Sequence, residues 1–298
     1  MDLLEGVTRM LENLSAEDRE RLQGLLIAAY NTPLGMTLLL TKLDDIATYD
    51  SRDYPLFANR WVDGRVEPTG FRHLERFHLE GTTPTWTFGC ADALLEKRVW
   101  MEPGANTTYV RYDLRRATAP LTLNVKAVVN YRDHHATTHG DDWRMHVEAV
   151  ERGLRITPFD GAAPFYVLSK RAEAVADHRW YRRYALAMED YRGLDAREDH
   201  LHVGRFHAEL QPGESLLIVA STDATPDLDP AAALDRRRTY EEELLRQSGV
   251  LNPADAVSTD APPWEQHLIL AADQFVVRRS LSEEAHGRSV IAGYPWFG

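Results

Sequence analysis

The string NYRDHH, residues 130–135, holds the densest group of side chains in this chain that could bind or transform a ligand. Tyr131 offers an aromatic face, and Arg132, Asp133 and His134 offer directional hydrogen bonds of the kind that sugar hydroxyls accept and donate. A β-branched, apolar run precedes the string, so we expect a strand that ends at the rim of a sheet. The alternative is an Arg132–Asp133 ion pair that fixes the loop, because such pairs are common and modest in energy.

A second candidate is the segment YDSRDYPLFANRW, residues 49–61. Its polar residues include Asp50, Arg52 and Asp53, and its aromatic residues include Phe57 and Trp61. Carbohydrate sites combine aromatic platforms with polar groups, because a sugar has apolar faces and hydroxyl edges. The alternative is that the two aromatic side chains are buried anchors of the loop, as large aromatic residues usually are.

Acidic residues are numerous, but their spacing assigns no catalytic pair. Glycoside hydrolysis needs one carboxyl group as proton donor and a second that activates water or attacks, about 5 to 9.5 Å away. Spacing along a chain cannot pair carboxylates across a fold, and most acidic residues are exposed. We therefore assign no catalytic residue and expect surface or turn positions for Asp50, Asp53, Asp133, Asp141, Asp142, Glu198 and Asp199.

Histidines cluster twice, within residues 134–142 and within residues 200–207. The first cluster matches no zinc or calcium loop in its spacing. The second alternates along a predicted strand, which is typical of packing on one sheet face or of exposure. The sequence also has no glycine-rich phosphate loop and no Gly-x-Ser-x-Gly motif. We expect neither a metal nor a cofactor.

The composition restricts the partners. Asp and Glu outnumber Lys and Arg by 46 to 34, which gives a net charge of −12 at pH 7. This charge repels nucleic acid and anionic membranes, whereas a neutral sugar is not repelled. The single cysteine, Cys90, excludes a disulfide framework. Asp2 and Glu5 argue against a signal peptide, and no run of about 20 apolar residues occurs, so we predict a cytoplasmic protein.

Three patterns divide the chain. Residues 1–23 carry Leu and Val at three- and four-residue spacing, which predicts an N-terminal helix. Residues 24–226 consist of short segments rich in Thr, Val, Tyr and Leu, separated by Pro, Gly and Asn, which predicts an all-β sandwich. Residues 227–298 return to helical spacing, and Asp229 with Pro230 marks the start of a helix.

Five strings in a fixed order carry a resemblance to one family. They are PLGMTLLLTKLDD (33–45), LEKRVWMEPGANTTYVRYDL (95–114), PLTLNVKAVVNYRDHH (120–135), YRGLDAREDHLHVGRFHAELQPGESL (191–216) and IAGYPWFG (291–298). Over residues 24–298 the chain resembles the N-terminal part of the bacterial and archaeal type of glycogen debranching enzyme, amylo-α-1,6-glucosidase. It departs from the family near its start, where Glu-Arg-Leu-Gln (20–23) stands in place of an Arg-Arg-Tyr-His-Gly string and only Arg21 matches.

The resemblance implies a large β-supersandwich, like the one that precedes glucoamylase-type catalytic domains, and linker helices that lead to an (α/α)6 barrel. The hydrolytic carboxylates would lie in that barrel, beyond Gly298. We therefore expect an N-terminal helical segment (1–23), a glucan-handling supersandwich (24–226), and linker helices with the truncated start of the barrel (227–298).

From this resemblance we expect the chain to orient an α-glucan, such as glycogen, limit dextrin or maltooligosaccharides, and to support the barrel. We expect no glucosidase activity from the chain alone. The predicted substrate-binding residues are Tyr131, Arg132, Asp133, His134, Asp50, Arg52, Asp53 and Trp296. Two alternatives remain open: a free-standing α-glucan-binding module, and an assembly domain that forms a homodimer through its apolar tail, residues 287–298.

Overall fold

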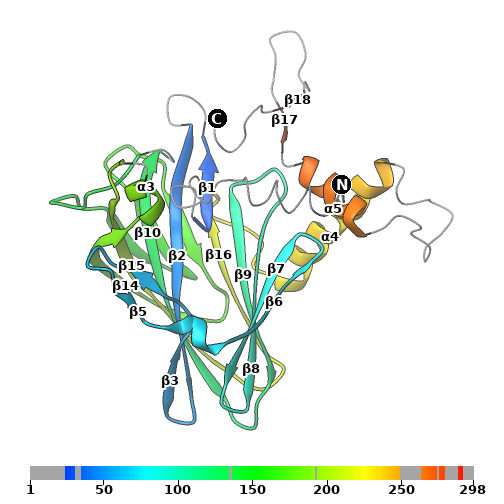
Figure 1. Ribbon diagram of the computed structural model, residues 1–298, viewed down its shortest axis with the longest axis horizontal. Coiled ribbons are helices and arrows are strands. Elements are labelled where there is room, and N and C mark those ends of the chain that lie inside the picture. Colours follow the sequence, from blue (N-terminus) through cyan, green and yellow to red (C-terminus); the bar gives the residue numbers. More distant parts are fainter. Residues whose placement is uncertain are drawn as a thin grey trace.

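The computed structural model describes residues 24–30, 35–133, 136–191, 193–248, 263–273, 275–278 and 288–290. Two antiparallel sheets dominate this part of the chain and stand face to face, as the left and right halves of Figure 1 show. The prediction of a mainly β sandwich is confirmed. The N-terminal helix predicted for residues 1–23 lies outside the described residues.

Sheet 1 has the order β1-β2-β10-β15-β14, with β3 paired to β2. Its strands are β1 (Leu26–Ala29), β2 (Met36–Tyr49), β3 (Arg52–Pro55), β10 (Leu121–Asp133), β14 (Glu173–Ala185) and β15 (Arg197–Leu210). The β10 strand pairs with β2 on one side and with β15 on the other. Segments that are distant in sequence therefore meet at the centre of this sheet.

Sheet 2 has the order β11-β12-β13-β16-β9-β8-β7-β6. Its strands are β6 (Leu74–Glu80), β7 (Thr83–Cys90), β8 (Ala93–Met101), β9 (Thr107–Arg116), β11 (His146–Val150), β12 (Gly153–Thr157), β13 (Phe165–Leu168) and β16 (Ser215–Ser221). Strands β6 to β9 form a meander of neighbours in sequence, because short turns join them.

Apolar side chains fill the space between the sheets. Alternate residues point inward, such as Leu123 from β10 and Val110 from β9, as the two-residue period of a strand requires. One acidic residue lies among them: the fully buried Asp45 accepts a hydrogen bond of 2.7 Å from Tyr112 and forms an ion pair with Lys97. Burial raises the pKa of the Asp45 carboxyl, and the Lys97 ammonium opposes that shift.

A helix, α4 (Pro230–Gln247), covers the outer face of sheet 2. Asp229 caps it by accepting hydrogen bonds from the backbone N–H groups of Ala231 and Ala232, and Pro230 lies in its first turn, as the sequence predicts. The contact is a second apolar cluster made of Trp100, Tyr109, Leu168, Leu217, Val219, Leu228, Ala233 and Leu234. The α4 helix therefore belongs to the packed unit.

The remaining elements are short or peripheral. They are β4 (Asn59–Arg60), β5 (Val66–Glu67), η1 (Gly70–His73), α3 (Ala187–Tyr191), α5 (Pro263–Asp273), β17 (Val276–Arg278) and β18 (Arg288–Val290). In Figure 1, α4 and α5 lie together on the right, beside sheet 2. No helix among the described residues is long and apolar enough to cross a membrane.

Candidate functional site

The predicted binding residues lie at opposite ends of sheet 1. Asp133, at the end of β10, pairs with Thr37 near the start of β2, whereas Asp53 pairs with Thr48 near the end of β2. Thr37 and Thr48 are eleven residues apart on one strand, which corresponds to about 36 Å. Figure 1 shows β3 at the lower tip of the sheet and the start of β2 at the upper end. The two groups therefore do not form one pocket.

The lower group forms a hairpin turn. Asp50 and Ser51 connect β2 to β3 and both have positive φ angles, 49° and 58°, as a two-residue type I′ turn requires. Asp50, Arg52 and Asp53 are exposed, and Thr48 Oγ1 donates a hydrogen bond of 2.7 Å to Asp53 Oδ1. The local geometry of the turn accounts for the polar residues of this segment.

The upper group is largely built into the fold. Tyr131 faces the core between the sheets, where its ring lies edge-on to Phe159 at 5.6 Å. Arg132 points to the opposite, outer face of sheet 1 and forms a buried ion pair with Glu198, with Nη2 to Oε2 at 3.1 Å. An ion pair thus holds Arg132, and Glu198 supplies its carboxylate, a partner that the sequence did not indicate. His134 and Trp296 lie outside the described residues.

A polar cluster surrounds this ion pair on the outer face of sheet 1. Asn130 Nδ2 lies 3.1 Å from His200 Nδ1, and Asn130 Oδ1 accepts a hydrogen bond of 2.7 Å from Thr138. Burial, together with the nearby charges of Arg132 and Lys42, lowers the pKa of His200 to about 3. His200 is therefore neutral near pH 7, and its Nδ1 accepts from the Asn130 amide, so its Nε2 carries the proton.

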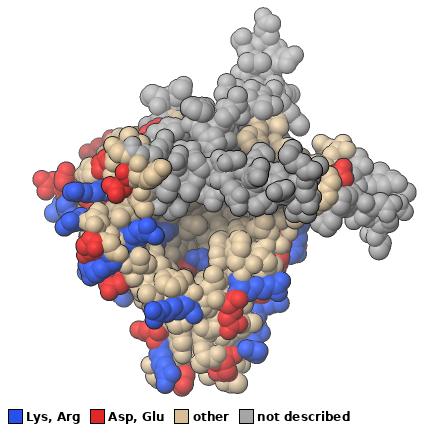
Figure 2. All heavy atoms as spheres, in the orientation of Figure 1, with Lys and Arg blue, Asp and Glu red and all other residues tan. Residues whose placement is uncertain are grey.

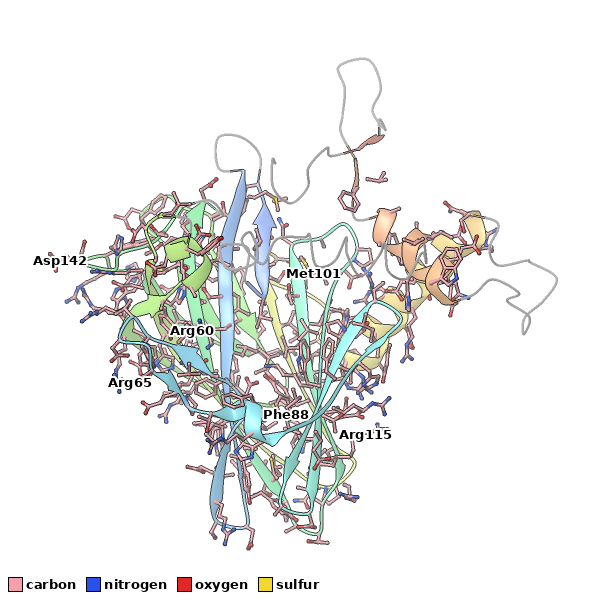
Figure 3. The ribbon with its side chains drawn as sticks, viewed as in Figure 1. Arg60, Arg65, Phe88, Met101, Arg115 and Asp142 are labelled. Atoms are coloured by element: carbon pink, nitrogen blue, oxygen red, sulfur yellow. The ribbon has the colours of Figure 1, made fainter. Side chains whose placement is uncertain are left out.

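A pocket of about 340 Å³ opens beside this cluster. Its lining residues are Thr41, Lys42, Ala58, Asn59, Arg60, Tyr184, Ala185, Leu186, Glu198 and His200. Strands β2, β14 and β15 supply the floor, and the segment that contains β4 lies over it. Trp61 fixes that segment by a β-bridge to Tyr184 and by ring stacking at 4.7 Å. Figure 3 labels Arg60, which lies against the middle of β2 in this view.

Some polar groups of the pocket have hydrogen-bond or ion-pair partners, and others have none among the described residues. Lys42 is paired with Asp44 at 2.9 Å and also bonds the side chain of Asn59. Tyr184 is 6% exposed, and neither its hydroxyl nor that of Thr41 has a hydrogen-bond partner among the described residues. Buried polar groups are almost always paired, so two unpaired hydroxyls at one cavity indicate room for a ligand or for water.

Sequence reasoning missed most of this pocket. It noted Glu198 as a surface acid and His200 as a packing residue, and it did not single out Lys42, Asn59 or Tyr184. One usable signal was present: Glu198, His200 and His202 alternate on a strand with apolar partners, which is unusual for a sheet face that is buried. No pattern in the sequence indicates that the loop around Asn59 folds back over them.

Charges elsewhere are mixed. Figure 2 shows Lys and Arg interspersed with Asp and Glu on the described part of the face in view, rather than gathered by sign. Among the described residues, no group of three or more His, Cys, Asp or Glu side chains could hold a metal ion.

Fold and pocket together define a class: a two-sheet antiparallel β sandwich with a helix packed on one outer face and a polar pocket on the other. Residues 13–217 match the family described as glycogen debranching enzyme N terminal. The match spans more than half of the chain, and the chain belongs to this family.

A solved structure with some similarity is a crystal structure of bacterial glucoamylase complexed with acarbose. The sequence identity is 10% and the TM-score 0.37, over 72% of this chain and 32% of the glucoamylase chain. This chain thus spans about a third of that glucoamylase, and the overlap is too low to define the fold. No curated protein sequence matches the chain.

Proposed function

We propose that this chain is the N-terminal, non-catalytic part of an α-1,6-glucosidase, in which it positions the α-glucan and supports the catalytic barrel. The observation that carries the proposal is the match of residues 13–217 to the N-terminal family of glycogen debranching enzymes. The carboxylates that hydrolyse the branch linkage would lie in the barrel. Division into a sandwich (24–226) and linker helices (227–298) is part of the proposal.

The attachment of the linker helices supports a scaffold role. Arg236 on α4 donates two hydrogen bonds, of 3.0 and 3.1 Å, to the carboxylate of Glu102, which directly follows β8. Tyr240 then donates a hydrogen bond of 2.6 Å to Asp273, which connects α4 to α5. These bonds add to the apolar cluster under α4, so they attach α4, and through it α5, to the sandwich.

Two further parts of the proposal concern ligand and compartment. Asp133, at the exposed end of β10, is the described residue of its string that a glucan at the upper rim could reach. Cys90 is buried and unpaired, which supports a reducing compartment such as the cytoplasm. Burial raises the pKa of its thiol to about 12, so the side chain acts as a small apolar residue.

Glucose release from a branched limit dextrin tests the proposal. We expect no release by residues 1–298 alone, and release when the chain is joined to a barrel of the same family. A barrel that is equally active and equally stable without the chain would contradict the scaffold role. Release by the chain alone would contradict its non-catalytic character.

Two further measurements test the alternatives of a free-standing glucan-binding module and an assembly domain. Calorimetry with maltooligosaccharides favours a free-standing glucan-binding module if the isolated chain binds them. Light scattering with and without residues 287–298 favours an assembly domain if the mass falls from dimer to monomer on removal of the tail.

A further inference from the structure

We propose that the pocket between the outer face of sheet 1 and the segment 58–61 is a binding site for a neutral sugar ring. The inference rests on the proposed function only for the choice of α-glucosides as probes. The size of the pocket, its two unpaired hydroxyls, its charge balance and its apolar walls support the assignment independently.

The size suits a small ligand. A volume of about 340 Å³ lies at the lower end of the range for small-molecule sites. The walls come from β2, β4, β14 and β15, so the site is a product of the tertiary fold. A bulge helps to form it: Val128 pairs with Lys42 and Val129 with Leu40, which leaves Thr41 out of the ladder.

The two unpaired hydroxyls call for a hydrogen-bonding ligand. Burial raises the pKa of Tyr184 well above its ordinary value, so its phenol stays protonated and can donate. A buried hydroxyl without a partner is costly, and a sugar hydroxyl can both donate to it and accept from it. Thr41, which also lines the pocket, carries a second buried hydroxyl without a partner among the described residues.

Charge balance favours a neutral ligand. Lys42 is neutralised by Asp44, Glu198 is neutralised by Arg132, and His200 is uncharged near pH 7. Among the buried groups of the pocket, an ionised ligand would therefore lose its hydration without meeting an uncompensated opposite charge. Arg60 also lines the pocket, but it is exposed to water.

Apolar surface completes the match to a sugar ring. The Tyr184 ring lies between Trp61, stacked at 4.7 Å, and His200, tilted at 4.7 Å. Ala58, Ala185 and Leu186 supply aliphatic surface around it. A pyranose has C–H faces for such surface and hydroxyls at its edges for the polar groups, whereas an aliphatic ligand would leave both hydroxyls unpaired.

The test is NMR titration of the full chain with methyl α-D-glucopyranoside and with maltose. Trp61 provides the reporter, because its indole N–H resonance is assigned by its loss in Trp61→Phe. We expect a saturable shift of this resonance, and an affinity lower by roughly three- to tenfold in Tyr184→Phe, which removes one hydroxyl. Tyr30→Phe is the matched control, since it removes another buried and unpaired hydroxyl, from a side chain packed against the core between the sheets.

A blocking variant gives a second measurement. Ala58 is exposed and lines the pocket, so Ala58→Trp fills it with little effect on folding, and we expect the shift to disappear. Ala119→Trp, at another exposed alanine in the β9–β10 turn, should leave the titration unchanged. An unchanged affinity in both Tyr184→Phe and Ala58→Trp would overturn the proposal, as would absence of any shift or tighter binding of inorganic phosphate.

Failure of this site and failure of the proposed function are distinguishable. Glucose release by the chain joined to a barrel reports the proposed function, whereas the Trp61 resonance reports the pocket. If glucose is released but the Trp61 resonance does not shift with sugar, the proposed sugar site is overturned and the proposed function is not. A saturable shift with no contribution of the chain to release or to barrel stability overturns the proposed function alone.

Discussion

The outer faces of the two sheets differ both in their side chains and in how they are covered. On sheet 2, Leu234 of α4 belongs to one apolar cluster with Trp100, and Arg236 of α4 adds an ion pair with Glu102. On sheet 1, the segment 58–61 touches the sheet through Trp61 and Tyr184 and leaves a cavity of about 340 Å³ beside the Arg132–Glu198 pair.

This difference separates two tasks. A long amphipathic helix can fill the grooves of a sheet face with side chains, and the result is a stable attachment. A short loop with one aromatic anchor cannot fill its face, so polar groups remain around a space. We infer that the face of sheet 2 serves assembly and that the face of sheet 1 serves a ligand.

The largest expected effect concerns the buried ion pair of sheet 1. Arg132→Met leaves the Glu198 carboxylate buried without its guanidinium, and we expect a loss of about 3 to 5 kcal/mol in the free energy of unfolding. Urea denaturation measures it. Arg65→Met is the control, because Arg65 forms an exposed pair with Asp63 and its loss should have far less effect on the free energy of unfolding. Equal losses would mean that the sheet 1 pair is not a buried structural element.

The second effect concerns the helix on sheet 2. Leu234→Ala removes apolar contact under α4, and we expect a loss of about 2 to 4 kcal/mol in a single cooperative transition. Leu268→Ala, the same change at an exposed position of α5, should fall within about 0.5 kcal/mol of the wild type. Separate unfolding of α4 before the sheets, seen by hydrogen exchange, would contradict its assignment to the packed unit.

The third effect is a pH dependence from the outer face of sheet 1. The pKa of His200 is lowered from 6.5 to about 3, mainly by burial and further by the charges of Arg132 and Lys42. Between these two pH values, His200 is therefore protonated in the unfolded chain and neutral in the folded chain. The stabilisation is complete above pH 6.5 and is lost as the pH falls, by about 1.4 kcal/mol per pH unit.

His200→Gln removes this titration. Between pH 7 and pH 5, the difference in unfolding free energy between wild type and variant should therefore shrink by about 2 kcal/mol. Urea titrations at both pH values measure it. A constant difference would show that His200 is solvated or charged in the fold, and the charge balance proposed for the pocket would fail with it.

The smallest effect lies at the β2–β3 hairpin, away from both faces. Ser51 has a φ of 58°, and glycine adopts this angle without strain, so Ser51→Gly should stabilise the chain by about 0.5 to 1 kcal/mol. A thermal denaturation series measures it, with Arg52→Ala expected within about 0.5 kcal/mol of the wild type. Destabilisation by Ser51→Gly would contradict the type I′ turn.

Features that depend on neighbouring residues follow the sequence patterns, whereas features that depend on distant residues do not. The β-rich middle and the Asp229 cap of α4 follow from strand periodicity and capping chemistry, and both are confirmed. The spacing of the histidines predicts that His200 and His207 lie on opposite faces of the strand, because odd and even positions alternate. Both lie on the outer face, since the register of β15 shifts next to Gly204, which has a φ of 155°. The polar string at Asp50 indicates a turn as much as a site, because turn residues and binding residues are chemically alike.

The sequence by itself determined the class of fold, the family and the separate characters of the strand-rich and helical parts, since these depend on short-range periodicity. Only the tertiary structure decided that Arg132 pairs with a carboxylate 66 residues away, that Trp61 locks a loop onto Tyr184, and that a cavity remains beneath it. Pairing, burial and an unfilled volume arise when distant segments come within a few ångströms of one another. Such contacts leave no periodic trace in a single sequence.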